Sequence, residues 1–186
     1  MSNKTTKNAE TWVRDRQAVL STDGKYRYCL HREWWEPGRT TRWVTFVMLN
    51  PSTADAVSDD PTTRRCIRFA KAWGATGLAV VNLYAMRATS PKDLRDTEDP
   101  VGPRNDDYLA LFFEMAARHD FPIIAAWGAQ AQPGRVEAVR QIPGAERLLA
   151  LGTTRSGAPR HPLYLRRDAT PTPWPNRTTH QTRKAA

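Results

Sequence analysis

The sequence predicts an α/β protein, a three-layer α/β/α sandwich with a central, mostly parallel four-stranded sheet and an N-terminal β-hairpin. Three observations predict this fold. Short apolar runs alternate with amphipathic helical segments, which favours parallel strands joined by helical crossovers. Each apolar run ends in a polar loop. The 186 residues are enough for one domain with a substantial core.

The N-terminal part of the chain is predicted to hold one strand after a flexible segment. Residues 1–22 are polar and without an apolar pattern, so we expect them to be flexible. In residues 25–35, Tyr26 and Tyr28 alternate with Arg27. Alternation of this kind is the period of a β-strand with Arg27 on the opposite face from the tyrosines.

A second strand is predicted to follow directly. Residues 36–39 form a Pro-Gly turn, and residues 42–49 are almost continuously apolar. Two strands that are joined by a short turn favour a hairpin between residues 25–35 and 42–49. The apolar run stops at Asn50 and Pro51, where the backbone must leave regular structure.

The first helix is predicted over residues 60–74. Asp60 is suited to cap its N-terminus, Pro61 fits the first turn, and Gly74 fits the end. The apolar stripe of this helix consists of Cys66, Phe69, Ala70 and Trp73. The basic stripe on the opposite side consists of Arg64, Arg68 and Lys71. The basic stripe fits either a solvated face or a surface that follows phosphates.

The remaining elements continue the alternation of strand and helix. Apolar runs predict strands over residues 78–83, 122–127 and 147–151. Amphipathic segments predict helices over residues 105–118 and 135–141. We therefore expect one domain over residues 23–168 and a basic, Pro-rich tail over residues 169–186, with Trp174 as the anchor of the tail.

Composition limits the partners and cofactors. The net charge is +9, and residues 155–186 hold seven basic residues and one acidic residue, a net charge of +6. This bias predicts a nucleic-acid partner. Two cysteines are too few for an iron–sulfur cluster or a closed zinc site, and we predict no cofactor and no metal. No apolar run reaches about 20 residues, so we expect no membrane binding. The first ten residues lack the apolar segment of a signal peptide, so we expect a cytoplasmic protein. We also expect a monomer.

Four polar loops are predicted to converge on one edge of the sheet. They follow the four predicted strands and span residues 50–60, 84–89, 128–134 and 152–161. In parallel sheets, ligands bind outside the carboxyl ends of the strands. The side chains expected at this edge from the first loop are Asn50, Ser52, Thr53 and Asp55.

Four segments in this order resemble motifs of the uracil-DNA glycosylase superfamily. They are MLNPS at 48–52, VVNLYA at 80–85, IIAAWGAQAQ at 123–132 and HPLYL at 161–165. The chain also resembles a family of small bacterial and phage-associated proteins with the signature MLNPSTAD, WG and GxPxHPLY. Met48 and Leu49 stand where the superfamily has a Gly before the first motif, and the cysteine count excludes the branches with an iron–sulfur cluster.

The resemblance implies a monofunctional DNA glycosylase with a uracil-DNA glycosylase-like fold. Asn50 would position a water below the sugar, and His161 would donate a hydrogen bond to the departing base; the alternatives are an Asx turn and a loop histidine. Asn82 would bind a base edge, unless its amide bonds to the neighbouring backbone. The other expected base-binding residues are Leu49, Tyr84 and Asp55. The expected DNA-binding residues are Ser52, Thr154, Arg155, Ser156, Arg160, Leu163 and Tyr164.

The substrate and two alternative functions stay open at this stage. Because the first motif departs from that of uracil enzymes, we favour a modified pyrimidine over uracil, for example a hypermodified phage base such as glucosylated hydroxymethylcytosine. Such an activity would serve anti-phage defence. In the first alternative, Asp55, Asp59 and Asp60 bind Mg²⁺ and the protein hydrolyses a nucleotide or phosphoester. In the second, the protein binds DNA without catalysis.

Overall fold

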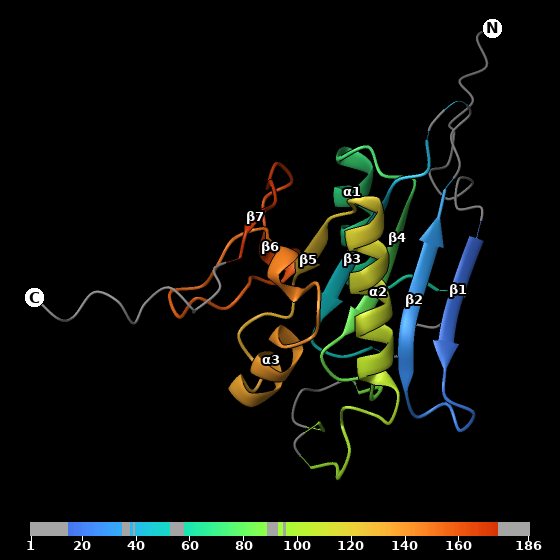
Figure 1. Cartoon of the computed structure of the whole chain (residues 1–186), viewed down its shortest axis with the longest axis vertical. Coiled ribbons are helices and arrows are strands. Elements are labelled where there is room, and N and C mark those ends of the chain that lie inside the picture. The colour runs from blue at the N-terminus through green and yellow to red at the C-terminus, as the bar shows by residue number, and fades with distance from the viewer. Residues whose placement is uncertain are drawn as a thin grey trace, which may run out of the picture.

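A mixed seven-stranded sheet forms the centre of the protein (Figure 1). The computed structural model describes residues 15–34, 38, 40–52, 58–88, 93–94 and 96–174. The strands are β1 (Asp15–Leu20), β2 (Arg27–Glu33), β3 (Trp43–Met48), β4 (Gly77–Asn82), β5 (Ile123–Ala125), β6 (Leu148–Ala150) and β7 (Thr172–Pro173). Their order across the sheet is β1-β2-β4-β3-β5-β6-β7.

The four predicted strands form the parallel centre of this sheet, but the predicted strand count was too low. β4, β3, β5 and β6 are parallel neighbours. β2 pairs antiparallel with β4, β1 with β2, and β7 with β6. β1 lies within residues 1–22, which were expected to be flexible, and β7 lies within the expected tail. Both are edge strands: β1 is half-buried to exposed with three apolar residues at one end only, and β7 has two residues. Neither therefore shows the apolar pattern of a buried strand.

The predicted hairpin between β2 and β3 was wrong. β3 is flanked by β4 and β5, so neither of its edges is open to β2. β2 instead pairs with β4 over residues 30–33 and forms the hairpin with β1. β2 is consequently an internal strand, and it is buried along most of its length.

Three helices connect the parallel strands. They are α1 (Pro61–Ala72), α2 (Asn105–His119) and α3 (Pro133–Arg140), and they confirm the helices that the sequence predicts. Asp60 caps α1 as expected, because its Oδ1 accepts a hydrogen bond from the Thr63 amide at 2.6 Å. Gly74 ends the segment with a φ of 77°, a conformation that favours glycine.

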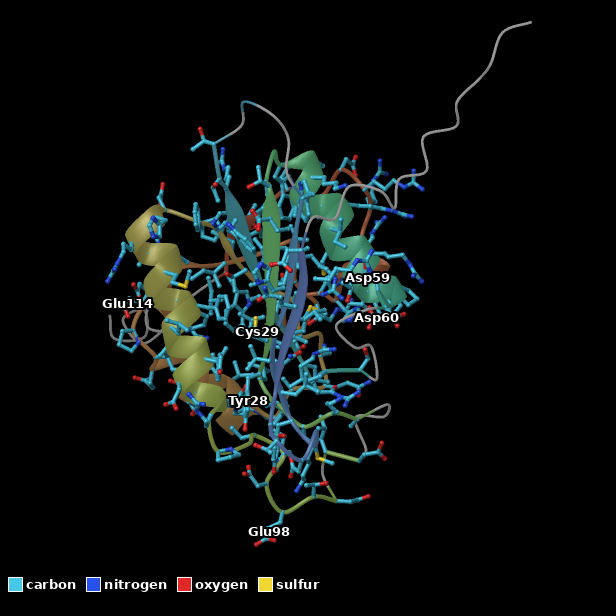
Figure 2. The ribbon with its side chains drawn as sticks, turned by 90° about the vertical axis from the view of Figure 1, so that its right-hand side faces the viewer. Tyr28, Cys29, Asp59, Asp60, Glu98 and Glu114 are labelled. Carbon is cyan, nitrogen blue, oxygen red and sulfur yellow. The ribbon has the colours of Figure 1, made fainter. Side chains whose placement is uncertain are left out.

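The helices cover both faces of the sheet (Figure 2). Cys66 and Phe69 of α1 pack with Phe46 and Leu78 on one face. Phe113 of α2 packs with residues of the opposite face, and Val139 of α3 belongs to the same core cluster. The arrangement is an α/β fold with helices on both sides of a mixed sheet.

The connections define a switch point in the sheet. The chain leaves β3 through α1 towards β4, and it leaves β5 through α3 towards β6, which lies on the other side. Crevices at such switch points, outside the carboxyl ends of the strands, are the usual ligand sites of open α/β sheets. A functional site is therefore expected at the carboxyl ends of β3 and β5.

Trp174 anchors the C-terminal end of the described chain, as predicted. Its ring packs edge-on against Trp127 with centroids 5.0 Å apart, and its indole N–H donates to the Gly157 carbonyl at 3.0 Å. This contact places β7 beside β6. Across the described ranges, none of the helices has the length and apolar character required to cross a membrane.

Candidate active site

A cavity of about 550 Å³ lies at the switch point. Met48, Leu49 and Asn50 line it at the end of β3, and residues 127–130 line it after β5. The rest of the wall comes from β2, β4, α1, η3 (Pro162–Tyr164) and the loops beside them. These other lining residues are Arg27, Ser52, Asp60, Thr62, Thr63, Cys66, Val80, Asn82, Ala88, Thr154, Arg160, His161 and Tyr164.

Asn82 is the most unusual side chain in this cavity. It is 1 % exposed, and within the described part of the chain neither its Nδ2 nor its Oδ1 has a hydrogen-bond partner. Leaving a buried polar group without a hydrogen bond costs about 1–3 kcal/mol. Native proteins bear such a cost rarely, and a functional role is one explanation of it. Asn82 therefore offers a donor and an acceptor to a ligand in the cavity.

The backbone that carries Asn82 is held from the opposite face of the sheet. Asn105 Nδ2 donates to the carbonyl oxygens of Asn82 and Leu83, each at 3.0 Å. The Leu83 carbonyl also accepts from Arg135 Nε at 2.7 Å, and Arg135 forms an ion pair with Asp106. These contacts replace the strand partners that β4 loses at its end. The backbone of Asn82 is thus held in place, although its side-chain amide forms no hydrogen bond with the described residues.

The side chain of Asn50 is oriented by the hydrogen bonds that its Nδ2 donates. Its Nδ2 donates to the carbonyl oxygens of Ala88 at 2.9 Å and of Pro51 at 3.1 Å. Both N–H groups are therefore used, and no donor within the described ranges contacts Oδ1. The side-chain carbonyl is the group that remains for a ligand or a water molecule. The predicted role of Asn50 requires this orientation.

His161 is held as a hydrogen-bond donor. Its Nδ1 accepts from the Leu163 amide at 3.4 Å, so the proton of the neutral ring lies on Nε2. Burial lowers the pKa of His161, although the negative charge of Asp60 opposes this shift. The ring is consequently neutral at pH 7. Gly128, whose φ is 77°, comes close to this residue: a Cβ at Gly128 would lie 3.7 Å from the His161 Cβ.

Asp60 brings a negative charge to the cavity wall. Its Oδ2 accepts from Ser52 Oγ at 2.5 Å, and its Oδ1 caps α1. Burial raises the pKa of Asp60, but the hydrogen bonds from Ser52 and Thr63 and the charge of Arg27 outweigh burial and lower it overall. Asp60 is therefore ionised at neutral pH. Ser52, which is expected to contact DNA, donates its hydroxyl hydrogen bond to this carboxylate and lines the cavity.

Arg27 is a cavity residue that the sequence did not indicate. It is 3 % exposed, and burial lowers its pKa to about 10, while the charge of Asp60 acts in the opposite direction. It keeps its positive charge at pH 7. Alternation along β2 places Arg27 opposite the tyrosines, and only the internal position of β2 makes that second face buried as well. The sequence shows only an arginine in an alternating strand. Its burial follows from the internal position of β2 in the sheet, which the sequence does not reveal.

Several predicted residues do not line the cavity. The prediction for Tyr84 was wrong in position, because its ring is buried in the core on the face covered by α2. β4 ends at Asn82, so the alternation that would place residue 84 beside Asn82 no longer applies. Arg155 and Ser156 lie exposed in the loop that follows Thr154, outside the cavity wall. Asp55 and Thr53 lie outside the described residues.

The rim of the cavity carries two exposed apolar side chains. Leu163 is 42 % exposed and Tyr164 is 75 % exposed. Both belong to η3, which follows His161 directly. Arg160, two residues before η3, is also exposed and lines the cavity. Arg160 and the HPLYL segment therefore place one basic and two apolar exposed side chains beside the cavity.

Asp59 and Asp60 have different surroundings although they are adjacent at the start of α1 (Figure 2). Asp59 pairs with the buried Arg32 at 2.7 Å and with Arg16 at 3.4 Å, and it does not line the cavity. The described residues contain one group able to hold a metal ion, formed by Asp15, His31 and Glu33 on the β1–β2 hairpin. None of these three lines the cavity.

Comparison with known proteins gives one match. The model of the family DUF1643, described as a protein of unknown function, matches residues 27–163. No curated protein and no solved structure matches the chain. The matched range contains every residue that lines the cavity except Tyr164. Because the match covers most of its length, the chain belongs to the DUF1643 family.

Proposed function

We propose that this protein is a monofunctional DNA glycosylase, which flips a modified pyrimidine out of DNA and hydrolyses its N-glycosidic bond. The observation that supports the proposal most is Asn82, a buried amide with two unsatisfied ends in a cavity at the switch point of the sheet. Asn50 and His161 line the same cavity. The resemblance to the uracil-DNA glycosylase superfamily gives these three residues complementary roles.

Asn82 would bind the edge of the flipped base. A pyrimidine presents a donor beside an acceptor on this edge, and an amide can match both at once. The hydrogen bonds would satisfy both ends of the Asn82 side chain. Flipping costs a few kcal/mol, which contacts in the cavity must offset. The hydrogen bonds that the base would supply to the unsatisfied Asn82 amide contribute to that offset.

Asn50 and His161 would act on the bond that breaks. The oxygen of a water molecule, held by Asn50 Oδ1, forms a bond to the sugar C1′ as the bond from C1′ to the base nitrogen breaks. The electron pair of that bond leaves with the base, and the Nε2–H of His161 donates to the base oxygen that becomes negative. The water loses a proton to solvent. The ionised Asp60 stabilises the positive charge that develops on the sugar.

The size of the cavity favours a substituted base. About 550 Å³ falls in the range of roughly 300–1,000 Å³ that is typical of sites for drug-sized ligands. An unsubstituted uracil needs much less. We therefore favour a pyrimidine with a large 5-substituent, such as glucosylated hydroxymethylcytosine of phage DNA, and with it a role in anti-phage defence.

The rim fits the handling of a flipped nucleotide. Leu163 or Tyr164 would fill the gap that the base leaves in the stack, as apolar wedges do in other DNA-bending proteins. Exposed arginines near the mouth, Arg155 and Arg160, would contact phosphates. A net charge of +9 favours association with DNA in general.

A panel of DNA oligomers tests this function. The protein is incubated in EDTA with oligomers that carry uracil, a thymine mismatch, hydroxymethylcytosine or its glucosylated form, and the products are treated with alkali. We expect strand cleavage at the glucosylated base, and loss of cleavage in Asn50→Ala and His161→Ala. Tyr84→Phe is the matched control, because this buried hydroxyl lies outside the cavity; it should retain cleavage.

Other outcomes of the panel identify the alternatives. Cleavage of uracil DNA alone would contradict the proposed substrate but keep the glycosylase. Activity that appears only in a parallel reaction with Mg²⁺ in place of EDTA would favour a metal-dependent hydrolase, a function that the Arg32 and Arg16 contacts of Asp59 do not favour. Salt-dependent binding with no product on any oligomer would favour a noncatalytic DNA-binding module, for which the net charge is the supporting observation.

A further inference from the structure

A second hollow, lined by arginines, lies between α1 and the segment after η3. It has a volume of about 410 Å³ and is lined by Arg65, Arg68 and Arg167, together with Phe69 and Ala72. Among the described residues, no acidic side chain lines it. We call it the arginine groove. Its walls come from the same two segments, α1 and the region of η3, that contribute Cys66 and His161 to the cavity.

Arg65 links the arginine groove to the cavity wall. Its guanidinium donates to the carbonyl oxygens of Pro162, at 3.4 Å, and of Leu165. It also lies over the ring of Phe69, 4.9 Å from the centroid. Arg65 therefore fastens η3, which directly follows His161, to α1. A ligand in the arginine groove would lie beside the segment that carries His161.

Arg68 and Arg167 differ from their basic neighbours. Arg64 donates to the Asp59 carbonyl, and Lys71 lies over the ring of Trp34. Arg166 forms two hydrogen bonds with Asp168, at 3.1 and 3.2 Å. Arg68 and Arg167 are exposed, and neither forms an ion pair within the described ranges. The basic stripe of α1 is therefore mostly bound to the protein itself, and Arg68 is the member of the stripe that remains available to a partner, beside Arg167 in the groove.

We infer that the arginine groove binds backbone phosphates of DNA on one side of the flipped nucleotide. This inference rests on the proposed function, since it takes DNA as the partner. Planar guanidinium groups bind phosphate oxygens through two parallel hydrogen bonds, and several of them along a groove suit successive phosphates. A position beside η3 would guide one flank of the strand away from the cavity mouth. The contacts would be independent of base sequence.

The salt dependence of binding tests the groove directly. Binding of the full chain to unmodified duplex DNA is measured by fluorescence anisotropy over a series of KCl concentrations. For Arg68→Ala/Arg167→Ala we expect the slope of log K against log [KCl] to become shallower by about 2, one for each lost phosphate contact. The affinity near physiological salt should fall on the order of 10-fold.

A matched variant removes the same charge from elsewhere. Arg104→Ala/Arg118→Ala changes two exposed arginines associated with α2, on the other face of the sheet. We expect this variant to keep the wild-type slope. A wild-type slope in the groove variant, or an equal loss in both variants, would contradict the inference. Because the DNA carries no releasable base, this result does not depend on glycosylase activity, and each proposal can fail without the other.

Discussion

Two asparagines meet where β4 ends, Asn82 of β4 and Asn105 of α2, and they differ in the hydrogen bonds of their side-chain amides. Asn82 and Asn105 are each 1 % exposed. Asn105, on the face covered by α2, donates through Nδ2 to two backbone carbonyls. Asn82, on the cavity face, uses neither end of its amide within the described residues. Equal burial thus hides a difference in bonding. The Asn105 N–H groups stabilise the strand end although its Oδ1 accepts no hydrogen bond, whereas both ends of the Asn82 amide lack a partner among the described residues.

Replacing Asn82 should give the largest effect on activity, without a matching loss of stability. In Asn82→Ala we expect base release to slow on the order of 100-fold, because two hydrogen bonds to the base edge are lost. The free energy of unfolding should stay within about 1 kcal/mol of wild type, since no protein hydrogen bond is removed. Single-turnover kinetics and urea denaturation measure the two quantities. A marked loss of stability would show that Asn82 is structural.

The same contrast extends to the two acids before α1. In Asp59→Ala we expect a loss of about 3–5 kcal/mol in the free energy of unfolding, because the buried Arg32 loses its carboxylate. Asp60→Ala should cost about 1 kcal/mol through the lost cap of α1, and it should slow base release more than Asp59→Ala does. Urea denaturation of both variants gives the comparison. Equal losses of stability would contradict it.

Replacing Asn105 should affect mainly stability. Asn105→Ala removes the donor to two buried carbonyls, so we expect the free energy of unfolding to fall by about 1–3 kcal/mol. Activity per folded molecule should fall less than in Asn82→Ala, because the catalytic groups remain. Urea denaturation and activity at a temperature where both variants are folded test this. If Asn105→Ala loses activity without stability, the comparison between the two asparagines fails.

The smallest expected effect is a pH dependence from His161. Its folded pKa lies below the usual value of 6.5, so the unfolded state binds the proton more readily. Stability should therefore decrease as the pH falls from about 6.5 through the folded pKa, and it should level off below that pKa. His161→Gln should remove this part of the pH dependence. Thermal denaturation over a pH series of both proteins measures the difference; identical curves would contradict it.

The sequence predicts the elements that local patterns determine. The apolar runs and caps locate the four parallel strands and the three helices, and the polar residues after the strands locate Asn50, Asn82 and His161 near one another. The partner of β2 could not be predicted, because strand pairing depends on which edges other strands already occupy. β1 carries no strong pattern because it is an exposed edge.

Errors in the candidate site have the same origin. Arg27 is polar in an alternating strand, which indicates exposure, yet both faces of β2 are covered. Tyr84 was expected beside Asn82, but regular alternation ends with β4. The roles of the neighbouring residues Asp59 and Asp60 depend on the partners that the fold brings to them, Arg32 for Asp59 and Ser52 for Asp60. Local patterns carry no information about those partners.

The most direct test of the central claim is detection of the released base. DNA that carries glucosylated hydroxymethylcytosine is incubated with wild type or with Asn82→Ala in EDTA, and the small products are identified by mass spectrometry. We predict free modified base from wild type, leaving an abasic site in an intact strand, and almost none from the variant. Release of a nucleotide rather than a base, or equal release by both proteins, would contradict the account.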